Sequence, residues 1–145
     1  MPHLSLPITP QGCVVDLIVG VSSQRADALR RAGQIVPAFV TVRGLIDTGA
    51  TSTCIDPDAV RSLGLTPTGT VPIHTPSTAG TAYLCPQYDV MLAVYHPKHS
   101  LVLGTMPIIT TPLSATGVDA LIGRDVLGNC LYVYDGAAGT FSLAF

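Results

Sequence analysis

The stretch that decides the fold is LIDTGA, residues 45–50. Two apolar residues lead into a tight turn that begins with a carboxylate, Asp47. In such a turn a threonine hydroxyl can bond to neighbouring backbone, and a glycine lets the chain bend without a clash at Cβ. Taken alone, the pattern is also typical of an ordinary turn after a strand. The context narrows the choice, because a helix start, DPD at residues 56–58, follows nine residues later.

A second motif, LIGRD at residues 121–125, lies about 75 residues further along the chain. Between the two motifs come a helix start, a predicted hairpin and a strand that opens with QYD at residues 87–89; an apolar C-terminal strand follows the second motif. This order of motifs, over residues 13–145, resembles the retropepsin family of single-domain aspartic proteases related to retroviral protease.

The resemblance implies an all-β fold: a retropepsin-like closed β-barrel half-domain with short helices, which acts as a homodimer. Residues 1–145 would form one such domain, with its core at about 13–145. Composition agrees, because the chain has 16 Thr and 15 Val but no Glu and a single lysine. Strong helix formers are therefore scarce and β-branched residues are abundant.

The resemblance also assigns roles to the residues of the turn. Asp47 matches the catalytic aspartate. Thr48 matches a threonine whose hydroxyl bonds across the dimer axis and holds two active-site loops together. Gly49 and Ala50 match positions beside the backbone of the bound substrate.

Gly123 and Arg124 match the start of a helix that packs under the active-site loop, where the guanidinium gives structural support. Retroviral members often carry a carboxylate four residues after the catalytic aspartate to receive this arginine, whereas this chain has Thr51. Three alternatives stay open for the partner of Arg124: Asp125, Asp56 or backbone carbonyls.

A flap over the substrate is expected at a hairpin spanning residues 73–84. Retroviral flaps are rich in glycine at the tip, but this tip has one glycine, so an ordinary surface hairpin is the alternative. The tip comprises Ser77, Thr78, Ala79 and Gly80. The C-terminus also departs from the pattern of retroviral members, because a tyrosine-rich hairpin replaces a simple final strand.

Peptide hydrolysis of this kind needs two carboxylates, one ionised to take a proton from water and one protonated to polarise the scissile carbonyl. The chain has only one Asp-Thr-Gly, so Asp47 needs its own copy from a second subunit on a twofold axis. The predicted function is an aspartic endopeptidase for extended peptides, with no cofactor and no metal. The alternatives are a non-catalytic dimeric peptide-binding module on the same fold and a protease for one particular partner.

Charge and hydropathy limit the kinds of partner that the chain is expected to have. Charged residues are 11% of the chain and the net charge is -2, which gives no indication of a nucleic-acid or membrane partner. The only basic cluster, Arg25, Arg30 and Arg31, is interpreted as a solvated face. The mean hydropathy of +0.49 suggests apolar surface hidden in an oligomer. No signal peptide or membrane span is evident, so we expect a cytoplasmic protein.

Other reactive side chains suggest weaker candidates. The four cysteines show no metal-like spacing, so free thiols are expected and two disulfides are the alternative. Cys54 lies seven residues after Asp47, but without a nearby histidine it is interpreted as a small buried hydrophobe. His96 and His99 flank Pro97 and Lys98 in a predicted turn, which is favoured over a metal site.

Periodicity and breakers predict the remaining elements. Strands are expected at 13–21, 34–46, 87–95 and 100–109, and a C-terminal hairpin at 131–145. Helices are expected within 22–33, ended by Gly33, at 57–63, capped by Asp56 and ended by Gly64, and at 120–130, where apolar residues have helical spacing. Residues 65–71 and 110–118 are expected to be loops.

Overall fold

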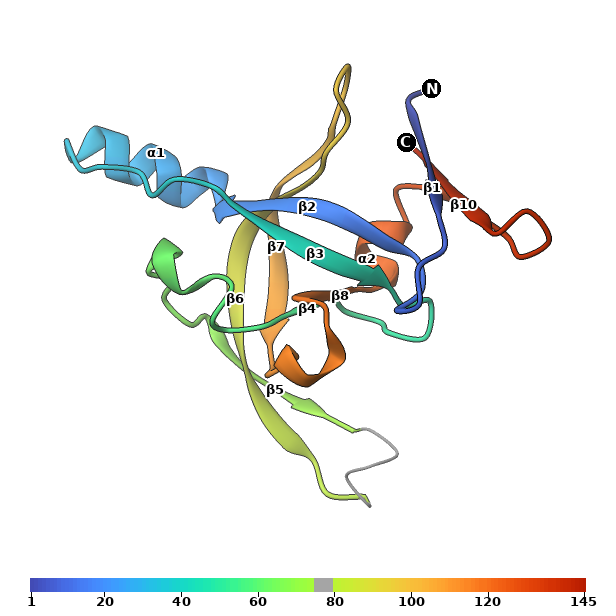
Figure 1. Cartoon of the computed structure of the whole chain (residues 1–145). Helices are drawn as coiled ribbons and strands as arrows, with labels where there is room; N and C mark the ends of the chain where they lie inside the picture. Colours follow the sequence, from blue (N-terminus) through green and yellow to red (C-terminus); the bar gives the residue numbers. More distant parts are fainter. Residues whose placement is uncertain (75–79) are drawn as a thin grey trace.

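A closed barrel forms the centre of the computed structural model, which describes residues 1–74 and 80–145 (Figure 1). Its sheet has the strand order β2-β3-β8-β4-β7-β6-β5, and a further pairing of β2 with β6 closes six of the strands into a ring. The strands are β2 (Val14–Val21), β3 (Val40–Ile46), β4 (Cys54–Ile55), β5 (Gly69–Ile73), β6 (Tyr83–Val94), β7 (Leu101–Thr110) and β8 (Ala120–Ile122). The predicted closed all-β barrel is confirmed.

Alternating side chains fill the barrel. In β2, Val15, Leu17 and Val19 are buried, whereas Asp16 between them is exposed. Each fully buried aliphatic side chain contributes about 1.5–3 kcal/mol relative to an exposed one. The core continues with side chains from all six strands of the ring, among them Val42, Ile55, Leu92, Ile108 and Ile122.

The pairing of β3 with β8 determines where the site lies. The two strands run parallel, with Gly44 opposite Ala120 and Ile46 opposite Ile122. A Cβ at Gly44 would lie 2.8 Å from Cδ1 of Ile122, so glycine permits this close approach. Because parallel strands end at the same edge, the residues that follow β3 and β8 emerge side by side.

A second sheet joins the two chain ends. It consists of β1 (His3–Pro7), β10 (Thr140–Ala144) and β9 (Leu131–Asp135), in the order β1-β10-β9. The β9–β10 hairpin confirms the C-terminal prediction, whereas β1 was not anticipated. Phe141 and Leu143 of β10 are buried and belong to the main core.

Helices are few and short, as predicted. Helix α1 (Ser23–Arg31) begins at Ser22, whose hydroxyl accepts a hydrogen bond from the backbone nitrogen of Arg25 at 3.2 Å. Gly33, just beyond it, has φ +67°, the left-handed conformation expected of a helix stop. Within residues 1–74 and 80–145 the other helical segments are η1 (Arg61–Leu63), η3 (Ser114–Thr116) and α2 (Arg124–Leu127). None of the helices in the described ranges is long and apolar enough to cross a membrane.

Four predicted elements differ from the structure in extent or type. The strand predicted at 34–46 begins only at Val40, because Pro37 has no N–H to give to a ladder. The helix predicted at 120–130 is wrong over its first residues, which form β8, and only Arg124–Leu127 is helical. The helix predicted at 57–63 is a turn followed by the 3₁₀ segment Arg61–Leu63, although Gly64 ends it at φ +58° as expected. Part of the predicted loop at 65–71 belongs to β5.

A hairpin is present at the predicted place as the pairing of β5 with β6, in which Ile73 lies opposite Tyr83. At its tip Gly80 has φ +82°, a conformation that favours glycine. The rest of the tip, Ser77, Thr78 and Ala79, lies outside the described residues. All four cysteines are free thiols, as predicted.

Candidate active site

Asp47 is the first residue after β3 and is half-buried at the edge of the barrel. Its backbone nitrogen donates to the carbonyl of Ile122 at 3.0 Å, and its carbonyl accepts from Ala50 at 3.1 Å. Its carboxylate oxygen Oδ1 accepts from the backbone nitrogen of Gly49 at 3.0 Å. A Cβ at Gly49 would lie 3.2 Å from that same oxygen. The turn therefore holds the carboxylate in place with backbone groups alone.

Arg124 ties this turn to α2. Its guanidinium donates from Nη1 to the carbonyl of Thr48 at 2.9 Å and from Nη2 to the hydroxyl of Thr51 at 3.0 Å. Its backbone nitrogen donates to the carbonyl of Ala50 at 2.9 Å. Of the three predicted alternatives, the structure selects backbone carbonyls, and Thr51 itself accepts in place of the missing carboxylate. Thr48 is exposed.

Thr53 and Asp125 form a second tie under the loop, which the sequence analysis missed. The hydroxyl of the fully buried Thr53 donates to Oδ1 of Asp125 at 2.7 Å and accepts from the backbone nitrogen of Gly123 at 3.0 Å. The backbone nitrogen of Thr53 donates to Oδ2 of Asp125 at 2.9 Å. The only signal in the sequence is an aspartate in the first turn of a short helix, which is too common to reveal such a network.

Gly123 makes the contact between loop and helix possible. A Cβ there would lie 2.7 Å from the backbone carbon of Ser52, closer than real Cβ atoms come. The predicted packing of Gly123 and Arg124 under the Asp47 loop therefore agrees with the observed contacts.

Cys54 lies close to this site but is not an activated thiol. Burial, with smaller effects from the nearby Cys85, Asp125 and Asp47, raises the pKa of Cys54 to about 11. The thiol is therefore protonated at neutral pH. Cys54 is only partly buried, so the prediction of a fully buried hydrophobe is wrong in extent.

The histidine pair belongs to a turn between β6 and β7. Nδ1 of His96 accepts from the backbone nitrogens of Lys98 at 3.2 Å and His99 at 3.3 Å. The ring packs edge-on against Phe145, with 6.3 Å between centroids. In the described part of the chain, no group of three or more His, Cys, Asp or Glu side chains is placed to hold a metal ion.

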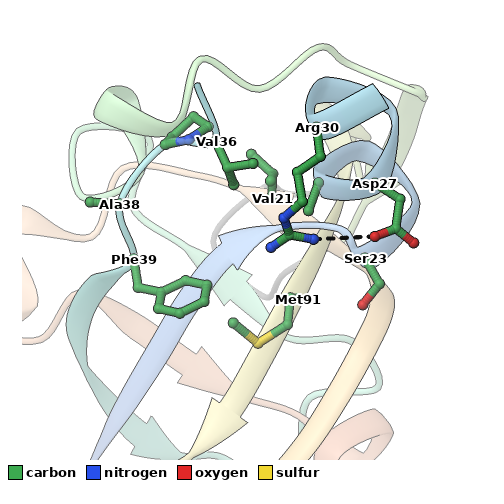
Figure 2. A pocket seen from close by; sticks show the side chains of 10 residues that line it. Val21, Ser23, Asp27, Arg30, Val36, Ala38, Phe39 and Met91 are labelled. Atoms are coloured by element: carbon green, nitrogen blue, oxygen red, sulfur yellow. Dashed lines mark hydrogen bonds and ion pairs between the residues drawn. The ribbon is translucent and has the colours of Figure 1, made fainter. Parts of the chain in front are cut away.

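Three cavities in the described part of the chain lie away from Asp47. One of about 380 Å³ lies between α1, residues 36–39 and Met91, at the opposite end of β3 (Figure 2). Two smaller ones, of about 310 and 230 Å³, share Gly64 and Leu65. Among the described residues that line these three cavities, none belongs to the Asp47 turn.

The barrel, with an Asp-Thr-Gly turn at the end of one strand, has the architecture of a retropepsin-like aspartic protease. The chain belongs to the aspartyl protease family, whose sequence model matches residues 38–126, more than half of its length. The matched range includes Asp47 and ends just after the Thr53–Asp125 network.

One solved structure shares the fold, and a second gives a weaker match. A retropepsin-like aspartic protease from Rickettsia conorii matches with a TM-score of 0.58 and 12% identity, over 99% of this chain and 91% of that one. A foamy viral protease-reverse transcriptase, solved in complex with an RNA/DNA hybrid, matches with a TM-score of 0.45 and 18% identity, over 79% of this chain and 12% of that one. Comparison with curated protein sequences gives no significant match.

Proposed function

We propose that the protein is an aspartic endopeptidase that works as a homodimer, with Asp47 of each subunit at the catalytic centre. The observation that carries this proposal is the carboxylate of Asp47, which is partly exposed at a strand end and is fixed by the backbone nitrogen of Gly49. Backbone groups and Arg124 hold the rest of the turn. A preorganised carboxylate in an open turn is suited to proton transfer.

The proposed reaction follows from two facing carboxyl groups that share one proton. The ionised carboxylate takes a proton from water while the water oxygen attacks the scissile carbonyl carbon, and the protonated carboxyl gives its proton to the carbonyl oxygen. The tetrahedral intermediate then collapses: the C–N bond breaks, the leaving nitrogen takes up the proton held by the dyad, and one hydroxyl of the intermediate returns its proton to the dyad, which restores the single shared proton and releases a carboxylic acid. No cofactor takes part in these steps.

The second carboxylate is proposed to come from a second subunit, since the chain has one Asp-Thr-Gly. Thr48 is exposed beside Asp47, which suits a hydroxyl that bonds across a twofold axis. Exposed apolar side chains on β9, at the edge of the small sheet, offer surface for a dimer to cover: Leu131, Val133 and Tyr134.

An extended peptide with apolar side chains near the cut is the proposed substrate. Gly49 and Ala50 would lie against its backbone. The β5–β6 hairpin would cover it, with Ser77, Thr78, Ala79 and Gly80 at the tip. Exposed Tyr83 and Leu84 at the start of β6 supply apolar contacts on the hairpin.

Asp47→Asn tests the proposal against a mixed peptide library. The substitution keeps the size of the side chain but removes base and acid from both halves of the dyad, so cleavage should fall by orders of magnitude while melting and dimerisation stay unchanged. Asp16→Asn, at an exposed position of β2, is the matched control and should cleave normally. Equal cleavage by a folded Asp47→Asn contradicts the proposal. Peptide binding without cleavage by the wild type would favour the non-catalytic module.

A further inference from the structure

A stretch of extended chain, QIVPAF at residues 34–39, joins α1 to β3. All six residues are within the described ranges and are in neither helix nor strand. Figure 1 shows the stretch running back alongside α1 before β3 begins. Proline fixes its own φ and favours extended backbone at the residue before it, so Pro37 holds Val36 extended. The backbone–backbone hydrogen bonds among the described residues do not include residues 35–39.

Large apolar side chains project from this backbone. Ile35 is 91% exposed and Phe39 is 65% exposed. Val36 is half-buried and, with Phe39, lines the cavity beneath the stretch (Figure 2). An extended backbone with free N–H and C=O groups and apolar side chains has the features of the substrate proposed above for the Asp47 centre.

Two other connections between elements lack this combination. In residues 64–68, Leu65 is half-buried and the backbone nitrogen of Thr68 donates to the carbonyl of Gln87 at 2.8 Å. In the turn between β6 and β7, the His96 ring accepts hydrogen bonds from two backbone nitrogens and so fixes the turn. Of these three connections, the stretch 34–39 is therefore the one suited to enter a cleft as an extended strand.

We propose that the protein cleaves its own chain in this stretch, and that the peptide bond between Ile35 and Val36 is cut first. The inference rests on the proposed endopeptidase function and names one substrate for it, a second copy of the same chain. This bond joins two large apolar residues and lies clear of β3. Water adds across it: the C–N bond breaks, Ile35 gains a terminal carboxylate and Val36 gains a terminal amine.

The geometry requires the cut to occur between molecules. The stretch precedes β3, Asp47 follows it, and β3 has seven residues. At about 3.3 Å per residue the strand spans about 23 Å, so the stretch cannot reach Asp47 of its own folded subunit. The second Asp47 of the proposed dimer faces the first and is equally out of reach. The fraction of chains cut in a given time should therefore rise in proportion to protein concentration.

A cut chain should stay assembled under native conditions. The fragment of residues 1–35 keeps β2, which pairs with both β3 and β6 and whose Leu17 and Val19 are fully buried. Only non-covalent contacts then join the two fragments. They should elute together in gel filtration and separate in urea.

The test is intact-mass spectrometry of the wild-type protein, incubated at mildly acidic pH at several concentrations. We expect fragments 1–35 and 36–145 to appear first. Ile35→Asp puts a charge where an apolar side chain must enter the cleft, and should slow this cut at least tenfold. Because Ile35 is exposed, the melting temperature and the cleavage of a mixed peptide library should stay unchanged. Val102→Asp, at a 58% exposed position within β7, is the matched control and should be cut as the wild type is.

The outcomes separate this inference from the function on which it rests. Cleavage of the library without a cut in residues 34–39 overturns the inference and leaves the proposed function standing. Failure to cleave both the library and the chain contradicts the proposed function itself, and the inference with it. A first cut elsewhere, or a cut fraction that does not change with concentration, overturns the inference. The same fragments from Asp47→Asn overturn it in favour of a contaminating protease.

Discussion

Thr53 shows how a single buried hydroxyl supports the candidate site. It donates to Asp125 and accepts from the backbone of Gly123, so it joins the strand after the Asp47 turn to the start of α2. Thr53→Val keeps the shape of the side chain but removes the hydroxyl, so Asp125 and the backbone nitrogen of Gly123 each lose a hydrogen-bond partner. We expect the free energy of unfolding to fall by about 1–3 kcal/mol. Urea unfolding at pH 7 measures this change. Thr53→Ser, which keeps the hydroxyl, should lose less, and a Val variant as stable as wild type would contradict the role.

Asp56 should make the stability of the chain depend on pH. It is buried, and Oδ2 accepts from the backbone of Leu113 at 2.7 Å while Oδ1 accepts from Asp58 at 2.9 Å. These bonds, above all the one from Leu113, lower the pKa of Asp56 against the opposing effect of burial. A lowered pKa means that the carboxylate stabilises the fold above its unfolded pKa and that this contribution is lost as pH falls through the folded pKa.

Asp56→Asn measures that contribution. The amide replaces one acceptor by an NH₂ group that faces a backbone N–H, so at pH 7 we expect a loss of about 1.5–3 kcal/mol in the free energy of unfolding. Urea unfolding at pH 7 and at pH 3 should show the gap between variant and wild type narrowing in acid. Asp16→Asn, at an exposed site, should show a small gap. A gap for Asp56→Asn that stays constant with pH would contradict the assignment.

At the scale of elements, the contact between α2 and the loop before β4 depends on Gly123. A Cβ added at Gly123 would collide with backbone atoms of Ser52 and Thr53, and backbone atoms cannot rotate away as a side chain could. We expect Gly123→Ala to cost about 1–3 kcal/mol of unfolding free energy, as overpacking typically does. Thermal or urea unfolding checks this. Gly69→Ala, where nothing lies within 4 Å of the new Cβ, is the control, and an equal effect at both glycines would show that crowding is not the cause.

Elements with strong local signals could be predicted from the sequence. Each of these signals determines the conformation of residues close to it in the sequence. They are the β-branched run of β2, the Ser22 cap and Gly33 stop of α1, and the glycine of the Asp47 turn. The short strands β1, β4 and β8 could not be predicted. Segments of two to five residues have little preference of their own for the strand conformation and form strands only by pairing with their partners. For the same reason apolar residues 121 and 122 were assigned to a helix.

The tertiary contacts of the candidate site were beyond sequence reasoning. The LIDTGA and LIGRD motifs indicate which two segments meet, but they leave three alternatives for the partner of Arg124. The observed partners, the Thr48 carbonyl and the Thr51 hydroxyl, depend on how the two chain segments pass each other after the parallel strands β3 and β8 end. Hydrogen-bond geometry of that kind is set by packing and has no local pattern.

At the scale of the whole molecule, the single chain supplies half of the proposed catalytic centre. The three cavities described above lie away from Asp47. The central claim is therefore that one cleavage site needs two copies of Asp47. A measurement on mixed dimers addresses this claim directly, because it varies the number of intact carboxylates per dimer without changing the wild-type chain.

In that measurement, increasing amounts of Asp47→Asn chain are added to a fixed amount of wild type, the subunits are allowed to exchange, and peptide cleavage is recorded at mildly acidic pH. If two Asp47 carboxylates are needed, random pairing should lower the rate to about half at an equal amount of variant and to about a tenth at a ninefold excess. Adding the Asp16→Asn chain instead should raise the rate. A rate that stays constant at every proportion of Asp47→Asn would contradict the account, because each wild-type chain would then cleave without a second Asp47.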